Sequence, residues 1–158
     1  MTATRTDRTA RHREPVQYAA LVFGVVFLLV GIAGFIPGIT TGYDTLQFAG
    51  HHSEAMLLGL FQVSILHNIV HLLFGVAGIL LARTAPQARM YLLVGGIIYL
   101  ALWIYGLVTG YESSANFVPL NTADNWLHLV LGVAMVGLTF LYRKGVPSGR
   151  ATQGQALP

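Results

Sequence analysis

Long runs of apolar residues, separated by short polar segments, dominate the chain. The first run covers residues 16–36, and runs of similar length lie at about residues 88–108 and 122–142. An α-helix needs about 20 apolar residues to cross the hydrocarbon core of a bilayer, which is about 30 Å thick. The pattern therefore predicts transmembrane helices over residues 16–36, 88–108 and 122–142.

A further run, residues 56–82, is too long for one straight membrane crossing. Its 27 residues would extend about 40 Å as a single α-helix. Ser64 lies inside the run, and serine is a favoured N-cap residue. We therefore expect a short interfacial helix at about residues 54–62, followed by a second span over residues 64–82.

Helix start and stop signals agree with these boundaries. Pro15 and Pro86 suit the first turn of a helix, where the N–H that proline lacks would have no partner. Asn121 and Asp124 have the spacing of a capping box, so the last span is predicted to begin near Thr122.

Two segments of the chain carry the same motif, one in the second predicted span and one in the fourth. Because the spacing is identical in both segments, the sequence predicts a duplicated pair of helices. The matching residues are Asn68, His71, Leu72, Gly75, Val76 and Ala77 in the first copy, and Asn125, His128, Leu129, Gly132, Val133 and Ala134 in the second.

The duplication determines the expected architecture. The second and fourth spans run in the same direction, so His71 and His128 should lie at similar depth in the membrane. We predict an all-α fold: a four-transmembrane-helix up-and-down bundle with pseudo-two-fold symmetry, forming one membrane domain over residues 15–143.

Composition supports a membrane protein. The chain of 158 residues is 54% hydrophobic and only 9% charged, which is too apolar for an ordinary water-soluble domain. It contains no cysteine, so disulfides, thiolate metal sites and iron–sulfur clusters are excluded. A nucleic-acid partner is not expected, since the basic residues flank apolar runs.

The distribution of positive charge predicts the orientation. All nine Lys and Arg residues lie in the two tails or in the connection between the second and third spans. Positively charged segments remain on the cytoplasmic side. We therefore expect disordered cytoplasmic tails at residues 1–14 and 144–158, in a multi-pass protein of the bacterial inner membrane.

The two motifs place polar side chains inside apolar helices. Asn68 and His71 share one helix face, as do Asn125 and His128, since residues three apart are neighbours on a helix. Such groups should face the bundle interior, where glycines let helices approach closely. Our main interpretation is a buried polar layer that holds the helices together or lines a path for protons or a small solute. Its residues are Asn68, His71, Asn125, His128 and His67, with Gly75 and Gly132 as close-packing glycines and Tyr99 or Tyr105 as further hydrogen-bond partners.

The alternative interpretation is a cofactor site. His71 and His128 could ligate a b-type haem from two helices, and His67, one turn before His71, could join them in a divalent-metal site. Glycines that bring helices together leave little room for a porphyrin. We therefore expect no cofactor, with haem or a metal as the alternative.

No catalytic constellation is visible in the sequence. The spans contain no Ser-His-Asp set and no pair of carboxylates, so we expect a non-enzymatic protein. The lipid bilayer is the predicted partner, and the sequence leaves open a homo-oligomer or a partner within a membrane complex.

Several motifs resemble a bacterial family of small membrane proteins, domain of unknown function family 4383. The resemblance extends from Val16 to Tyr142 and implies four predicted spans and a membrane location. It implies no established activity, substrate or cofactor. The similar segments are residues 43–51, 58–63, 66–75, 116–121 and 123–128.

Overall fold

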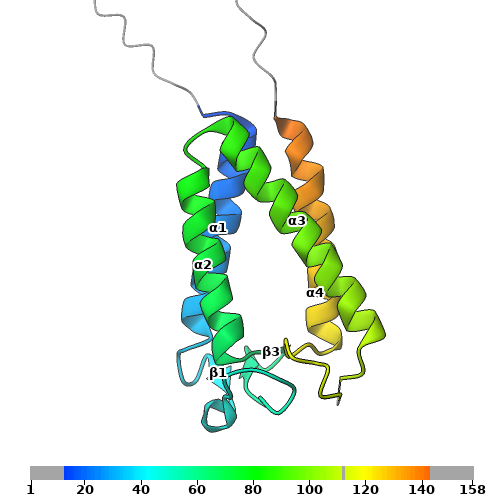
Figure 1. Ribbon diagram of the computed structural model, residues 1–158. Helices are drawn as coiled ribbons and strands as arrows, with labels where there is room; N and C mark the ends of the chain where they lie inside the picture. The colour runs from blue at the N-terminus through cyan, green and yellow to red at the C-terminus, as the bar shows by residue number, and fades with distance from the viewer. Residues whose placement is uncertain (1–12, 112, 143–158) are drawn as a thin grey trace, which may run out of the picture.

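The computed structural model describes residues 13–111 and 113–142 and consists mainly of four helices in up-and-down order (Figure 1). The tails predicted at residues 1–14 and 144–158 lie outside the described residues, apart from Arg13 and Glu14. The helices are α1 (Pro15–Ala33), α2 (Ile65–Leu81), α3 (Ala85–Val108) and α4 (Thr122–Leu138), and the short 3-10 helix η2 (Thr139–Leu141) extends α4.

Three of these helices are long and apolar enough to cross a membrane. They are α1, α3 and the continuous segment Thr122–Leu141 formed by α4 and η2. Helix α2 is apolar but has only 17 residues, which corresponds to a length of about 25 Å. The structure therefore supports a membrane protein and an all-helical body.

The predicted N-caps of α2 and α4 are confirmed. The Ser64 hydroxyl accepts a hydrogen bond from the His67 N–H at 3.1 Å. At α4, the Asn121 side chain accepts from the Asp124 N–H at 2.9 Å, and the Asp124 carboxylate accepts from the Asn121 N–H at 3.1 Å. Both caps satisfy backbone donors that have no partner within the helix.

The predicted interfacial helix at residues 54–62 is wrong. This segment contains strands β2 (Met56–Leu57) and β3 (Phe61–Gln62), which form an antiparallel hairpin. Strand β1 (Thr40–Thr41), followed by the 3-10 helix η1 (Tyr43–Thr45), pairs with β2 and completes a three-stranded sheet.

The turn between β2 and β3 explains why a helix does not form here. Three residues, Leu58–Leu60, separate the paired Leu57 and Phe61. Leu58 and Gly59 both have positive φ angles, 55° and 68°, which a type I′ hairpin turn uses and a right-handed helix does not. Inside the hairpin Ser53 Oγ donates to the Val63 carbonyl at 2.5 Å. An apolar run that continues into α2 thus changes from strand to helix at Ser64.

The helices pack as two close pairs, α1 with α2 and α3 with α4. Figure 1 shows the pairs meeting at the end of the bundle where α1 begins and α4 ends, while α2 and α3 diverge toward the sheet. The Gln17 side chain of α1 holds the connection between α2 and α3 at the first end, because its amide donates to the carbonyls of Ala82 and Arg83 at 3.0 Å each.

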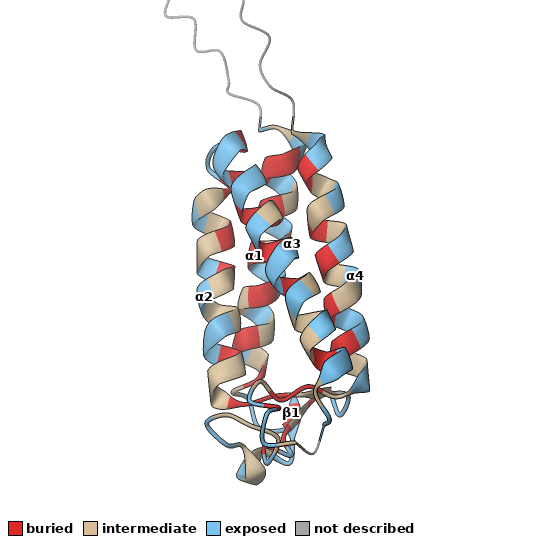
Figure 2. Cartoon of the chain, turned by 45° about the vertical axis from the view of Figure 1, so that its right-hand side comes forward, coloured by how far each residue is buried: buried red, intermediate tan, exposed pale blue. Residues whose placement is uncertain are grey.

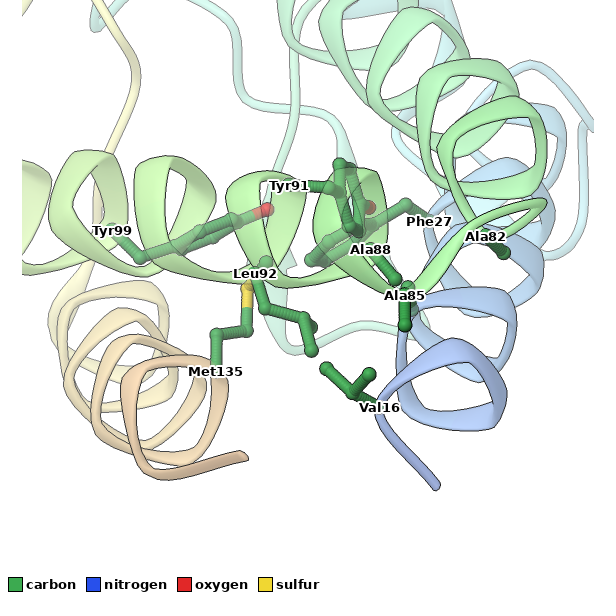
Figure 3. Close-up of a cluster of buried hydrophobic side chains, with 10 residues drawn as sticks. Val16, Phe27, Ala82, Ala85, Ala88, Tyr91, Leu92, Tyr99 and Met135 are labelled. Carbon is green, nitrogen blue, oxygen red and sulfur yellow. The ribbon is translucent and has the colours of Figure 1, made fainter. Parts of the chain in front are cut away.

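A continuous apolar core fills this end of the bundle (Figure 3). Val16 of α1, Leu92 of α3 and Met135 of α4 are fully buried within it. Figure 2 shows exposed positions along the outer faces of the helices, and many of them carry large apolar side chains, Val22 and Leu73 among them. An apolar outer surface around an apolar core is the arrangement expected of helices surrounded by lipid.

Candidate functional site

Two histidines on the first turns of α2 begin the site. His67 and His71 lie one helical turn apart, and their rings stack at 4.3 Å between centroids and 8° between planes. The His71 Nδ1 atom is 3.0 Å from the His67 carbonyl oxygen. A carbonyl only accepts, so His71 carries a proton on Nδ1 and its Nε2 atom is free to accept.

Tyr99 of α3 links these rings to α4. Its hydroxyl lies 3.3 Å from His71 Nε2 and donates to that atom. The Tyr99 ring contacts His128 edge to face, with centroids 5.1 Å apart, and stacks on Phe27 at 5.3 Å. We call His67, His71, Tyr99 and His128 the His/Tyr cluster. Of the two predicted tyrosine partners Tyr99 belongs to it, whereas the Tyr105 hydroxyl donates to the Ala115 carbonyl.

His128 is the member of the cluster with free hydrogen-bonding capacity. Its side chain is buried, and its Nδ1 atom has no hydrogen-bond partner among the described residues. The ring nitrogens of His67 also form no hydrogen bond with the described residues. Only the backbone N–H and carbonyl of His67 are hydrogen-bonded. A buried polar atom without a partner destabilises the fold and therefore requires an explanation.

The two asparagines of the predicted layer lie away from the His/Tyr cluster. The Asn68 side chain packs against Gly34 at the end of α1, and the Asn125 side chain packs against Gly106 near the end of α3. Neither amide hydrogen-bonds to a histidine, and Asn68 Nδ2, Asn68 Oδ1 and Asn125 Oδ1 have no partner within the described residues. The structure thus divides the expected layer into a histidine cluster and two helix contacts.

Gly75 and Gly132 allow close packing within each helix pair. A Cβ atom on Gly75 would lie 2.7 Å from the Leu28 Cα atom, and one on Gly132 would lie 3.0 Å from the Leu100 backbone nitrogen. Real Cβ atoms do not approach backbone as closely as the contact at Gly75, so that position requires glycine unless the helices move apart. At Gly132 the Leu100 backbone and side chain would both have to shift to make room for a Cβ atom.

A cavity of about 220 Å³ lies beside the cluster, between α2 and α3. We call it the α2/α3 cavity. Residues 117–119 lie at one end, and apolar side chains from both helices form its walls. Its lining includes all four cluster residues together with Leu66, Val70, Phe74, Ile98 and Leu102.

A second cavity, of about 150 Å³, lies on the other side of the cluster. We call it the α1/α4 cavity, because α1, α4 and the sheet form its walls. His67, His71, Tyr99 and His128 line this cavity as well. The His/Tyr cluster therefore separates two cavities.

The cofactor alternatives find no support in this geometry. No group of three or more His, Cys, Asp or Glu side chains is arranged to hold a metal ion within residues 13–111 and 113–142. Both ring nitrogens of His71 already lie against the His67 carbonyl and the Tyr99 hydroxyl. A haem ligated by His71 and His128 would have to displace Tyr99, whose side chain contacts both.

The contact between the α4 capping box and the β2–β3 hairpin was not predicted from the sequence. Asp124 also accepts a hydrogen bond from the Gln62 N–H of β3 at 3.0 Å, and the Asn121 amide donates to the Leu60 carbonyl at 2.8 Å. The α4 capping box therefore also holds the β2–β3 hairpin. Sequence spacing reveals a cap, but it carries no signal for a partner about 60 residues away.

The family model described as domain of unknown function (DUF4383) matches residues 17–141. No curated protein and no solved structure matches the chain. The matched residues include all four helices, the sheet and the His/Tyr cluster. The chain therefore belongs to the family of domain of unknown function DUF4383.

Proposed function

We propose that the chain is a non-enzymatic four-span membrane protein that binds a small molecule at the His/Tyr cluster. The observation that carries this proposal is the buried His128 ring, which has an unpaired Nδ1 atom and lines two cavities. A bound molecule with a hydrogen-bonding group would supply a polar partner to this ring.

The order of the helices supports four spans. Helices α1 and α3 are candidate spans that both run toward the sheet, and only residues 82–84 separate α2 from α3. This order supports a return across the same layer through α2. A span of about 25 Å is short for a bilayer core of about 30 Å, which favours local thinning of the membrane around α2.

Equivalent contacts in the two helix pairs support the duplication. Gly24, Leu28 and Gly34 of α1 have the same spacing as Gly96, Leu100 and Gly106 of α3. Each of these residues meets a residue of the neighbouring helix, and these neighbours are also equivalent in the two helix pairs. The matched contacts are Gly24 with Gly75 and Gly96 with Gly132, Gly75 with Leu28 and Gly132 with Leu100, and Asn68 with Gly34 and Asn125 with Gly106.

The orientation proposed is cytoplasmic termini in a bacterial inner membrane. Arg83 and Arg89 lie at the end of the bundle where α1 begins, and the sheet lies at the other end. Positive charge favours the cytoplasmic side. The His/Tyr cluster then lies in the outer half of the membrane, near the sheet.

The geometry favours a binding site over a conduit for protons or solutes. From the cluster toward the termini the interior is packed with apolar side chains, including Phe27, Leu92 and Met135. A conduit needs polar groups or water along the whole crossing. The polar lining described here ends at the level of His71 and His128.

The experiment is native mass spectrometry of the protein extracted gently from membranes. We expect an adduct of a few hundred daltons on the wild-type chain, lost in Val70→Trp, because tryptophan at this wall position fills the α2/α3 cavity. Val76→Trp is the matched control, since Val76 lies on the same helix, is also exposed, and does not line either cavity. An adduct that both variants retain, or a wild-type chain without one, would contradict the proposed site.

A further inference from the structure

The walls of the α2/α3 cavity are almost entirely apolar. Leu66, Val70 and Phe74 of α2 face Ile98 and Leu102 of α3. An apolar wall binds a hydrocarbon body through the hydrophobic effect and dispersion, and it offers nothing to a polar solute.

Apart from Ser64, whose hydroxyl caps α2, the polar side chains that line the cavity belong to the His/Tyr cluster. His71 and Tyr99 already bond to each other. The rings of His67 and His128 also line the cavity, and neither ring forms a hydrogen bond with the described residues. A ligand that fits must therefore combine an apolar body with one polar head group that can donate to or accept from an imidazole.

The head group must be uncharged. The residues that line the α2/α3 cavity include no Asp, Glu, Lys or Arg. Moving an ion into such a site removes its hydration without supplying an opposite charge, which is far more costly than burying a neutral hydroxyl or carbonyl.

The mouth of the cavity lies on the lateral surface of the bundle. Val70 on α2 is 41% exposed and Ile98 on α3 is 40% exposed, and both line the cavity. Residues 117–119 cover the end near the sheet. In a membrane this opening faces acyl chains, so a ligand would enter sideways from the lipid phase.

We infer that the α2/α3 cavity takes an uncharged amphiphile from the bilayer, with its hydroxyl or carbonyl head at His128 and His67 and its apolar chain between α2 and α3. This inference rests on the proposed function and names its ligand class. Entry from the lipid phase also explains why one side of the cluster opens between two apolar helices.

The test uses decan-1-ol as the probe and the imidazole nitrogen signals of ¹⁵N-histidine-labelled protein in detergent micelles. We expect saturable shifts at His67 and His128, assigned by single His→Asn variants. The outer-loop residues His51 and His52, which do not line either cavity, serve as internal references and should not shift.

Two further probes isolate the head group. Decane has the same chain without a head, and decanoate has an ionised one. We expect decan-1-ol to bind roughly two- to tenfold more tightly than decane, the factor that one neutral hydrogen bond supplies. Decanoate should give no saturable shift at His128.

Cavity-filling variants assign the shifts to the α2/α3 cavity. Val70→Trp, and independently Ile98→Trp from the opposite wall, should abolish the response to decan-1-ol, whereas Val76→Trp should retain it. Each variant is accepted only if its circular dichroism and elution volume match the wild type. Two tryptophans on different helices protect the test against one variant that misfolds.

The outcomes separate this inference from the proposed function. Equal affinity for decane and decan-1-ol, or tighter binding of decanoate, would overturn the uncharged-amphiphile inference while the binding site stands. No shift with any probe, together with a native adduct that Val70→Trp removes, would also overturn the ligand class alone. No shift and no adduct would overturn both.

Discussion

The two helix pairs share their packing but differ in their chemistry. In both pairs a glycine of the second helix lies against the backbone of the first, Gly75 against Leu28 and Gly132 against Leu100. In both pairs an asparagine closes the contact near the sheet. The residues that the pairs have in common therefore build the frame of the bundle.

The residues that differ form the candidate site. Tyr99 in α3 occupies the position that Phe27 occupies in α1, and Asp124 in α4 corresponds to His67 in α2. Tyr99 donates to His71, whereas Phe27 has no hydroxyl to offer His128. The hydrogen bond that Tyr99 gives His71 Nε2 therefore has no counterpart at His128, because the residues at these two equivalent positions differ.

The largest loss of stability is expected from variants that disrupt the close helix packing shared by the two pairs. Gly75→Ala and Gly132→Ala each place a methyl group against the backbone of the neighbouring helix. We expect each to lower the free energy of unfolding by about 1–3 kcal/mol, the usual cost of overpacking. SDS titration in mixed micelles, followed by circular dichroism, measures this change.

Gly137→Ala is the matched control on α4. A Cβ atom there meets no described atom within 4 Å, and alanine is the better helix former by up to about 1 kcal/mol. We expect this variant to be neutral or slightly stabilising. Similar losses at all three glycines would mean that the Leu28 and Leu100 contacts do not decide the result.

Much of the frame could be predicted from local sequence. The apolar runs indicated four helices, Ser64 marked the start of α2, and the Asn121–Asp124 spacing marked the start of α4. These features depend on residues within one or two turns of each other. Local spacing is therefore sufficient to predict them.

The remaining features depend on which surfaces meet in space. Residues 54–62 belong to an apolar run, and nothing local indicated that Met56–Leu57 would pair with β1 and Phe61–Gln62. Helical spacing likewise put Asn68 and His71 on one face, but that face is wide enough for Asn68 to contact α1 while His71 contacts α3. The candidate site therefore contains the histidines and Tyr99, but not the two asparagines that the motif also predicted.

A smaller loss of stability is expected from variants at the N-caps of α2 and α4, which differ in their number of hydrogen bonds. Asp124→Ala removes the hydrogen bonds from the Asn121 N–H and the Gln62 N–H, and we expect a loss of about 2 kcal/mol, since each hydrogen bond contributes about 1 kcal/mol. Ser64→Ala removes only one cap bond and should cost about 1 kcal/mol. The same SDS titration compares the two variants.

Amide hydrogen exchange at Gln62 shows whether the hairpin contact accounts for the difference. Exchange should accelerate in Asp124→Ala and remain unchanged in Ser64→Ala. Asp124→Asn keeps one acceptor oxygen and should lie between the wild type and the alanine variant. Equal losses of stability in Asp124→Ala and Ser64→Ala would show that Asp124 acts as a cap alone.

The smallest effect is expected from substitutions at Tyr99 and Phe27, the equivalent aromatic positions that differ between the helix pairs. Tyr99→Phe leaves His71 Nε2 without its donor, and we expect a loss of about 1 kcal/mol and a shift of the His71 nitrogen signals. Tyr18→Phe is the control, because Tyr18 is 55% exposed on the outer face of α1 and should change neither quantity.

Phe27→Tyr makes the opposite change, so that both helix pairs carry a tyrosine at this equivalent position. Phe27 and His128 both line the α1/α4 cavity, so the new hydroxyl can donate to the His128 ring and compete with a ligand head group. We expect the shift of His128 by decan-1-ol to weaken by a factor of about two to ten, as for one neutral hydrogen bond, with helix content unchanged. A full response in Phe27→Tyr would mean that the free ring of His128 does not arise from the Phe27 and Tyr99 difference, and that the asymmetry of the site lies elsewhere in α4.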